Sequence, residues 1–499
     1  MNANLYQLFA DVFSANRDAV ALELPEGDSC TFGDLDELAG RFAAYLIDHG
    51  VKPGDRVMAQ VDKSIGAVGL YLGTLRSGAA FVPLNISYTP SEVAFFLGDA
   101  EPRVFACRPG ELGEFPATDD CSHVEMGTSP EAGLWRKVLA TDPTTSVAAV
   151  GDEDLAAILY TSGTTGRSKG ATLSHRALAS NALALHRIWG FEPSDVLIHA
   201  LPIFHVHGLF VALHTAFLNA SKQIFLPAFD AAKVRAELPR ATILMGVPTF
   251  YTRLLAEPGF GADDCRAMRL FISGSAPMTE HVHGEWTAAT GHAILERYGM
   301  TEAGMITSNP LDGERVPGTV GYALPDVEVR VCTESGEPLP AGEVGQIEIR
   351  GPNLFSGYWN LPEKTAEEMR DDGFFLTGDL GSLSEDSRLQ IVGRSKDLII
   401  SGGYNIYPKE IETVLDDVDG VAESAVVGVP HADMGEGVVA VLVADGERPD
   451  DERLKAALTD KLARFKHPRR VYWVEQLPRN AMGKVQKKAL RETYVSAFD

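Results

Sequence analysis

A polar, glycine-rich segment at residues 161–170 directly follows an apolar run at residues 155–160. The apolar run predicts a buried strand. Glycines let several backbone N–H groups point toward one place, hydroxyls add donors, and Lys169 supplies the positive charge that a polyphosphate requires. The common P-loop places its lysine directly after a glycine, whereas Lys169 stands three residues after Gly166. The segment therefore predicts a different kind of phosphate-binding loop, with a flexible connection to a helix as the alternative.

Helical and strand patterns alternate through the first 150 residues of the chain. Residues 32–46 and 67–75 have the apolar spacing of helices, and residues 55–61 and 79–84 have that of strands. Such alternation predicts a parallel sheet with helices on its faces, and therefore an α/β fold class.

Three later segments, residues 241–249, 270–277 and 294–304, combine an apolar strand pattern with a turn and predict strand–turn–helix units. The ends of such strands meet at one edge of an open sheet, where ligands bind. Residues 318–350 alternate between apolar and polar side chains and predict a β-rich subdomain, either a small barrel or a distorted sheet. Residues 395–499 read as a separate small α/β domain after a large domain of doubly wound sheets at residues 1–394.

The charge of the chain limits the class of partner. The chain has 44 basic and 69 acidic residues and a formal charge of −25, which argues against nucleic acid or an anionic membrane and favours a cytoplasmic enzyme. Five scattered cysteines without a Cys-x-x-Cys pair favour a reducing compartment. The chain does not begin with the pattern of a signal peptide, and histidines interrupt its longest apolar stretch, residues 196–218, so no membrane span is expected.

Two histidines, His205 and His207, stand two residues apart, with His199 and His214 nearby. This cluster invites a metal site, but helical spacing does not place the four on one face, and no cysteine or carboxylate is close. Satisfied core histidines are a second interpretation.

The segment Thr-Ser-Gly-Thr-Thr-Gly-Arg-Ser-Lys-Gly resembles the signature of the adenylate-forming superfamily, which includes acyl-CoA synthetases, adenylation domains and luciferases. Further motifs of that superfamily follow in order at residues 201–208, 270–277, 296–302, 378–379, 393–397 and 478–484. The likeness covers nearly the whole chain and is greatest to malonyl-CoA synthetases. It implies that Mg·ATP and a carboxylate form an acyl-adenylate and pyrophosphate, after which the thiol of coenzyme A displaces AMP. It also implies that the C-terminal domain is mobile.

The resemblance implies roles for individual residues. The catalytic residues are Lys484, Glu302, Thr301 and His205, and Glu302 also holds Mg²⁺. The residues of the ATP and AMP site are Thr161, Ser162, Gly163, Thr164, Thr165, Gly166, Lys169, Gly274, Ser275, Ala276, Pro277, Glu296, Arg297, Tyr298, Gly299, Met300, Asp379 and Arg394. The acyl site includes His207, Ser275 and Met305.

Other implied roles concern the second half-reaction. Lys396 is the hinge of the C-terminal domain, and Gly402 and Gly403 lie where the pantetheine arm of coenzyme A passes. Arg469 and Arg470 belong to the densest basic run in the chain, and we expect them to attract the nucleotide phosphates of coenzyme A; a solvated helix end is the alternative.

The expected substrate is malonate, with methylmalonate as a close alternative. A dicarboxylate keeps one charged group after the other is adenylated, so the acyl site needs a cation. Arg253 stands four residues after Thr249 on a predicted helix and is our candidate, with a surface pair to Glu257 as the alternative.

Three other functions remain open from the sequence: a ligase for another short or medium-chain acid, an adenylation enzyme that loads a carrier protein, and a non-catalytic nucleotide-binding module. Retention of Lys484 and Glu302 argues against the last. If Lys484 is exposed in one domain orientation, a lysine acetyltransferase and deacetylase are further expected partners.

Overall fold

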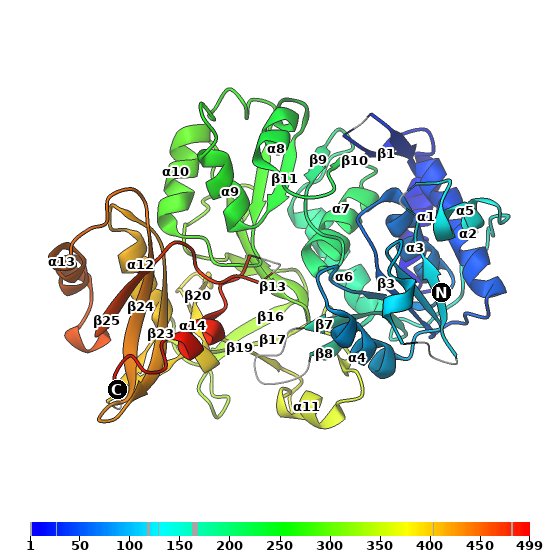
Figure 1. Ribbon diagram of the computed structural model, residues 1–499. Helices are drawn as coiled ribbons and strands as arrows, with labels where there is room; N and C mark the ends of the chain where they lie inside the picture. Colours follow the sequence, from blue (N-terminus) through cyan, green and yellow to red (C-terminus); the bar gives the residue numbers. More distant parts are fainter. Residues whose placement is uncertain are drawn as a thin grey trace.

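The computed structural model describes residues 2–25, 27–116, 120–127, 129–161, 168–402, 404–480 and 483–499. Most of the predicted phosphate loop, including Ser162, Gly163, Thr164, Thr165 and Gly166, lies outside the described residues, as does Gly403. Three sheets form the larger part of the molecule, and a fourth belongs to the C-terminal part, drawn in orange and red at one end of Figure 1.

The first sheet has the strand order β18-β8-β7-β4-β3-β5-β6. Its strands are β3 (Arg56–Gln60), β4 (Ala80–Pro83), β5 (Val104–Cys107), β6 (Ser122–Glu125), β7 (Leu155–Thr161), β8 (Lys169–Ser174) and β18 (Gly357–Tyr358). Its predicted parallel core is confirmed, because β3 pairs in parallel with β4 and β5. The predicted helices are α2 (Phe32–Asp48) and α3 (Ile65–Arg76), and α1 (Leu5–Ala15), α4 (Pro90–Ala100) and α5 (Gly133–Leu139) accompany them.

The phosphate segment joins two antiparallel strands. The strand β7 pairs with β8 from Leu155↔Ser174 to Thr161↔Lys169, so the chain turns back into the same sheet before the helix α6 (His175–Ile188) begins. The strand β18 then adds to the other edge of β8. The lysine of the segment is therefore fixed at the first position of a strand, and the alternative of a connection leading straight to a helix is wrong.

The second sheet has the order β15-β14-β13-β12-β11-β9-β10-β1-β2. Its strands are β1 (Val20–Glu23), β2 (Ser29–Thr31), β9 (Val196–His199), β10 (Lys222–Phe225), β11 (Ile243–Gly246), β12 (Leu270–Ser273), β13 (Leu295–Met300), β14 (Gly304–Ser308) and β15 (Tyr322–Ala323). Its helices are α7 (Leu213–Leu218), α8 (Ala231–Glu237), α9 (Pro248–Leu255) and α10 (Glu280–Thr290). The first two predicted strand–turn–helix units are confirmed by β11 with α9 and by β12 with α10.

The third predicted strand–turn–helix unit is wrong. The strand β13 is followed by a tight turn and the antiparallel strand β14. Gly304 has a φ of 60°, a left-handed conformation that glycine adopts readily, and a Cβ at Gly299 would overlap the backbone oxygen of Gly304. The turn therefore holds Thr301 and Glu302 between two strands instead of at a helix start.

The predicted β-rich part forms an open antiparallel sheet of β16 (Glu328–Cys332), β17 (Gly345–Arg350), β19 (Phe375–Leu383) and β20 (Leu389–Arg394), with no closure into a barrel among the described strands. Helix α11 (Pro362–Glu367) precedes β19. Figure 1 shows this sheet beside β13, in the middle of the molecule.

The C-terminal part has hydrophobic cores of its own, built from side chains such as Ile411, Val426 and Leu442 on one face of its sheet and Val427, Val441 and Leu490 on the other. Its strands are β21 (Ile399–Ser401), β22 (Tyr404–Ile406), β23 (Val421–His431), β24 (Gly435–Ala444) and β25 (Arg470–Val474). Its helices are α12 (Pro408–Asp416), α13 (Asp451–Lys461) and α14 (Lys487–Thr493).

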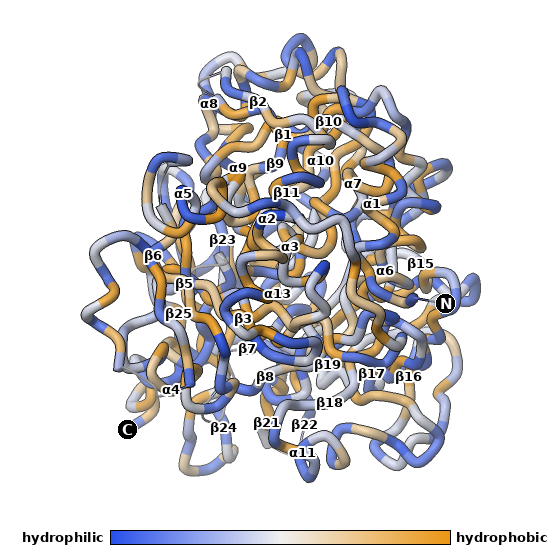
Figure 2. The backbone as a smooth tube through the Cα atoms, turned by 90° about the vertical axis from the view of Figure 1, so that its right-hand side faces the viewer, coloured by the Kyte–Doolittle hydropathy of each residue, from blue (hydrophilic) through white to orange (hydrophobic). Residues whose placement is uncertain are grey.

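The fold is thus the expected α/β arrangement of a large N-terminal part and a small C-terminal part. Figure 2 shows the hydrophobic segments gathered in the strands and helices of the interior, with hydrophilic segments in the outer loops. Among the described residues, no helix is both long and apolar enough to cross a bilayer.

Candidate active site

Lys169 of the phosphate segment contacts a carboxylate and an aromatic ring. Its Nζ lies 3.1 Å from Glu368 Oε1 and 3.9 Å from the ring centre of Tyr358. Thr161, at the other end of the segment, donates its hydroxyl to the backbone oxygen of Lys169 at 3.3 Å. The two ends of the loop are therefore joined, and the lysine is held beside them.

Glu302 is the buried carboxylate of the turn after β13. The Tyr358 hydroxyl lies 3.0 Å from Glu302 Oε1, and burial raises the pKa of Glu302 above its usual value. Magnesium in nucleotide sites is usually bound by one or two carboxylates together with phosphate oxygens. The residues present fit such an ion, since Glu302 supplies a carboxylate and the described residues contain no cluster of three or more His, Cys, Asp or Glu that would form an all-protein cage.

Tyr298, Asp379 and Arg394 form one connected group. The Tyr298 hydroxyl donates to Asp379 Oδ2 at 2.5 Å, and Arg394 Nε lies 2.8 Å from Asp379 Oδ1. Asp379 and Tyr298 are buried, and burial together with the Asp379 charge raises the pKa of Tyr298 well above 10.0. The group joins β13, β19 and β20, so three strands present an aromatic ring, a carboxylate and a guanidinium at one place.

Lys484 reaches this place from the C-terminal part. Its side chain is accessible within the cleft, but the surrounding protein displaces bulk water and, with the nearby Arg394 charge, lowers its pKa to about 8. Asp379 and Glu302 act on it in the opposite direction. A Cβ at the preceding Gly483 would lie 3.6 Å from Thr249 Oγ1 of α9, so the loop rests against the N-terminal part.

Two of the four histidines in residues 199–214, His205 and His207, lie near Arg297. His207 is buried, and its Nδ1 lies 3.4 Å from Ser275 Oγ. The backbone N–H of His207 donates to Nδ1 of His205, which is therefore neutral. Burial, with the charges of Lys484 and Arg297, lowers the pKa of His205 to about 3, so both histidines face the site as uncharged rings.

The other two histidines have structural partners. His199 contacts Lys63 Nζ through Nδ1 at 2.8 Å and the Gly208 backbone oxygen through Nε2 at 2.9 Å. His214 contacts the Tyr71 hydroxyl at 2.7 Å. The structure thus divides the cluster into two site residues and two core residues, and a four-histidine metal site is wrong.

Arg297 is a buried cation without a hydrogen-bond partner among the described residues. Only 3% of its surface is exposed, and no described group forms a hydrogen bond with its Nε, Nη1 or Nη2. Burial lowers its pKa to about 9. A Cβ at Gly274 would overlap the guanidinium, so the glycine after β12 makes room for it. The charge acts on both His205 and His207, which places it at the acyl side of the site.

Arg253, the candidate anchor from its spacing, lies on the exposed side of α9. Phe250, Tyr251 and Leu254 form the buried face of α9, whereas the Arg253 side chain is exposed to solvent. A buried charge pair with a substrate carboxylate is therefore not available to it in this structure. The Gly274–Arg297 contact shows where a buried guanidinium does lie.

The remaining predicted nucleotide residues surround these groups. Gly274, Ser275, Ala276 and Pro277 form the turn after β12, and Glu296, Gly299 and Met300 belong to β13. Ser275 has a φ of 69°, which is uncommon for a residue with a side chain and fixes its hydroxyl toward His207. Burial raises the pKa of Glu296 to about 8, and the Gly318 N–H donates to its Oε1 at 3.3 Å.

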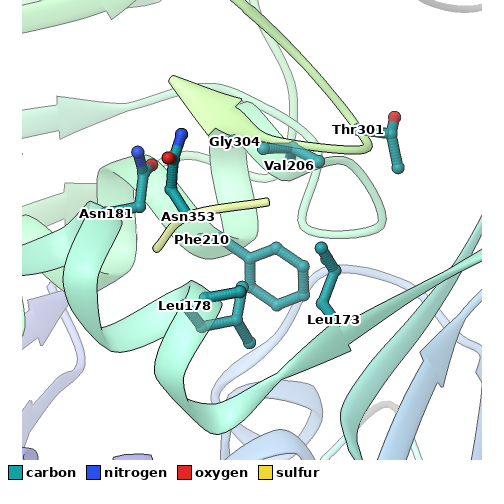
Figure 3. A pocket seen from close by; sticks show the side chains of 9 residues that line it. Leu173, Leu178, Asn181, Val206, Phe210, Thr301, Gly304 and Asn353 are labelled. Carbon is teal, nitrogen blue, oxygen red and sulfur yellow. The ribbon is translucent and has the colours of Figure 1, made fainter. Parts of the chain in front are cut away.

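A small apolar cavity lies behind Thr301. Figure 3 shows side chains from α6, β8 and the turn of π-helix η2 (His207–Ala212) around it. Its lining residues are Leu173, Ala177, Leu178, Asn181, Val206, Phe210, Thr301, Gly304 and Asn353. Val206 stands between the two site histidines, so the packing around this cavity supports both the histidine loop and the Thr301 turn. Met305 is buried beside them, and its backbone N–H and oxygen bond to Asn181.

The residues predicted for the second half-reaction lie at the end of β20 and in the C-terminal part. Lys396 is in the short 3₁₀ turn Ser395–Asp397, directly after β20. Gly402 has a φ of 58°, and its N–H donates to the Met434 oxygen at 2.8 Å. Arg469 and Arg470 are exposed on the C-terminal part, and the Arg470 guanidinium lies 5.3 Å from the Phe498 ring centre. The charges of Arg394 and Asp379 act on Lys396, so this residue lies near the group that these two form with Tyr298.

The sequence does not predict two of the residues near Lys169 and Glu302. Tyr358 and Glu368 join Lys169 to Glu302, yet each looks ordinary in the sequence. Their position depends on the pairing of β18 with β8. This pairing brings Glu368 into contact with Lys169, which stands 199 positions earlier in the chain. Local sequence patterns carry no signal of such a pairing.

Comparisons with known proteins agree with this geometry. Residues 9–359 match the family model of the AMP-binding enzymes, and residues 410–484 match that of the AMP-binding enzyme C-terminal domain. A protein from Arabidopsis thaliana described as malonate–CoA ligase is 34% identical, over 99% of this chain and 89% of the relative.

Solved structures give the same assignment. ATP-bound MatB from Rhodopseudomonas palustris is 51% identical and has a TM-score of 0.96, with 100% of both chains covered. Apo MatB from the same organism has a TM-score of 0.86 over the same share of both chains. The overall arrangement is thus more similar to the ATP-bound structure. Because both family models match, the first over more than half of the chain, the chain belongs to the family of AMP-binding enzymes.

Proposed function

We propose that the protein ligates malonate to coenzyme A at the expense of ATP, through malonyl-adenylate, with release of pyrophosphate and AMP. Two observations outside the site support this: the Arabidopsis relative is described as a malonate–CoA ligase, and the chain is 51% identical to MatB throughout its length. The observation that carries the proposal is the buried, unpartnered guanidinium of Arg297.

A buried unpaired charge is costly, so its retention needs a counterpart. Malonate provides one, because a free carboxylate remains when the other is adenylated. A guanidinium can hold both oxygens of that carboxylate. His207 and Ser275, which lie next to each other at the same side of the site, are neutral donors that complete an acyl site of this size. The anchor role that we assigned to Arg253 from its spacing therefore passes to Arg297.

The first half-reaction uses charge and position. A carboxylate oxygen of malonate attacks the α-phosphorus of ATP, and the bond to the bridging oxygen breaks as pyrophosphate leaves. We assign Lys169 to the departing phosphates, Lys484 to the α-phosphate and the attacking carboxylate, and Tyr298 with Asp379 to the adenosine. Bound at Glu302, magnesium would neutralise phosphate charge. His205 is uncharged, so we assign it to lining the site as a polar side chain and not to donating a proton.

The second half-reaction needs the space that Lys484 occupies. The thiol sulfur of coenzyme A attacks the acyl carbonyl, the thiol proton is lost and AMP leaves. We propose that residues 395–499 turn about Lys396 to withdraw Lys484, and that Gly402 and Gly403 then border the path of the pantetheine arm. Arg469 and Arg470, both exposed, would attract the nucleotide phosphates of coenzyme A. We place the enzyme in the cytoplasm.

The accessible side chain of Lys484 also suggests control by acylation. Acetylation would remove the charge that the first step requires, so a lysine acetyltransferase and a deacetylase would switch the enzyme off and on. Purified protein acetylated at Lys484 should lose adenylation and recover it on deacetylation; an unchanged rate would contradict this control.

The test of the main proposal is a panel of acids assayed for AMP release that depends on coenzyme A. Malonate should give the highest kcat/KM, methylmalonate the next, and propionate and butyrate much less. Higher activity with a monocarboxylate would refute the malonate assignment. Acyl transfer to a carrier protein in preference to free coenzyme A would favour the alternative of a loading enzyme.

A further inference from the structure

Four side chains from distant parts of the chain form a continuous path between the phosphate lysine and the magnesium carboxylate. Lys169 Nζ contacts Glu368 Oε1 at 3.1 Å, and the Tyr358 hydroxyl lies 2.7 Å from Glu368 Oε2 and 3.0 Å from Glu302 Oε1. The Tyr358 ring also presents its face to Lys169, at 3.9 Å. Tyr358 and Glu302 are buried, and Lys169 and Glu368 are partly buried. The path therefore runs from a buried carboxylate to a partly exposed lysine.

The Tyr358 hydroxyl cannot serve both carboxylates equally. A phenol hydroxyl has one hydrogen to donate, so it can donate to Glu368 or to Glu302 but not to both. Which carboxylate needs the hydrogen depends on its other partners. When Lys169 is on Glu368, that carboxylate is already compensated and the hydrogen can serve Glu302.

A cation at Glu302 reverses this preference. A metal ion bound there compensates Glu302, and the hydrogen of Tyr358 can then serve Glu368. Glu368 also keeps a second lysine, because Lys364 Nζ lies 3.2 Å from the same Oε1 atom. Lys169 can then leave Glu368 without exposing an uncompensated carboxylate.

Glu368 and Glu302 together disfavour a bare polyphosphate, because both carry negative charge near the lysine that the phosphates must reach. We propose that Glu368 retains Lys169 until a metal ion compensates Glu302, and that the Tyr358 hydroxyl couples the two events, so that the site prefers metal-bound to metal-free ATP. This inference rests on the phosphate role proposed for Lys169 and on the metal role proposed for Glu302.

The test compares binding of ATP with Mg²⁺ and binding of ATP with excess EDTA, measured by titration calorimetry without acid or coenzyme A. The measured quantity is the dissociation constant of metal-free ATP divided by that of ATP with Mg²⁺. Glu368→Gln should tighten binding of metal-free ATP by about three- to tenfold, the scale of one partly buried ion pair, and lower the ratio accordingly. Tyr358→Phe keeps the ring under Lys169 and should also lower the ratio.

The matched control is Glu367→Gln, one position earlier on the same helix end. Glu367 is exposed and pairs with Lys364 at 2.8 Å, so this change removes the same charge without touching the path. Glu367 shares Lys364 with Glu368, but its replacement leaves Lys169, Glu368, Tyr358 and Glu302 in place, so the ratio should stay unchanged. A ratio in Glu368→Gln within about twofold of that in Glu367→Gln would overturn the proposal.

A second background separates release of Lys169 from simple loss of repulsion. In Lys169→Met there is no lysine to retain, so adding Glu368→Gln should no longer tighten metal-free binding. If it tightens binding there as much as in the wild-type background, the coupling is refuted and only repulsion remains. If Lys169→Met alone leaves ATP binding unchanged, the phosphate role of Lys169 fails, a result distinct from failure of the coupling.

Discussion

Replacing Arg297 by methionine tests the substrate proposal directly. Methionine has a similar length and no charge, and 97% of the Arg297 surface is already shielded, so the change removes the guanidinium without opening the surface. Loss of a buried partner of a charged group costs about 2–5 kcal/mol. This corresponds to a fall of roughly 30-fold to several-thousand-fold in kcat/KM for malonate.

The assay compares malonate with propionate, which has a methyl group in place of the second carboxylate. Propionate gains nothing from Arg297, so its kcat/KM should be unchanged or higher in Arg297→Met. The matched control is Arg253→Met, because Arg253 is exposed on α9 and should leave both substrates unaffected. An equal loss for both acids in Arg297→Met would refute the anchor, as would turnover of malonate within about threefold of wild type.

The same variant should be more stable in the absence of ligand. Burial lowers the pKa of Arg297 to about 9, so the folded state holds the charge less favourably than the unfolded state does near neutral pH. Removing the charge should raise the free energy of unfolding by about 1 kcal/mol or more. In a chain of this size such a change raises Tm by one to a few degrees. A lower Tm would mean that the guanidinium has partners in solution.

Other predictions concern the two half-reactions. Lys484→Ala should nearly abolish adenylation, measured by pyrophosphate exchange, but should spare thioester formation from pre-made malonyl-AMP. An equal loss in both half-reactions would refute the two-conformation mechanism. Since the pKa of Lys484 is lowered to about 8, its ammonium is present below that pH and lost above it, so kcat/KM for adenylation should fall above about pH 8, and Lys484→Arg should move this limb upward. Lys396→Pro should allow the adenylate to form but stall its transfer to coenzyme A, because it restricts rotation at the hinge; normal turnover would place the hinge elsewhere. Charge reversal at Arg469 and Arg470 should raise KM for coenzyme A and not for ATP. Unchanged constants would favour two merely solvated arginines at the start of β25, where the structure places them instead of at the helix end that the sequence offered as the alternative.

Sequence patterns predicted most of the fold because local periodicity decides most of its elements. The helix at residues 32–46 and the strand at residues 55–61 appear as α2 and β3 within two residues. The turn after β13 was misjudged as a helix start, because its outcome depends on Gly304 in a left-handed conformation and on pairing with β14. Such pairing is a long-range property.

The acyl site shows why spacing alone is a weak guide to side-chain direction. Thr249 and Arg253 do share one side of α9, but the apolar residues Phe250, Tyr251 and Leu254 define the buried side, and Arg253 lies off it. That signal was present in the sequence. Arg297, by contrast, is a charged residue within a buried strand, which is unusual unless it is paired or functional. Only the structure shows that no residue in the described part of the chain forms a hydrogen bond with its guanidinium.

The charges around the site explain how so acidic a chain binds a polyphosphate. The chain carries −25, yet Lys169, Arg297, Arg394 and Lys484 face Glu302, Glu368 and Asp379 within one cleft. One of these four cations, Lys484, belongs to the C-terminal part, and the other three come from elements of the sheets. Withdrawal of Lys484 therefore removes one of these cations and lowers the local attraction for phosphate. The domain movement that clears space for the thiol would by the same act weaken the hold on AMP, so one displacement serves both thioester formation and release of the nucleotide.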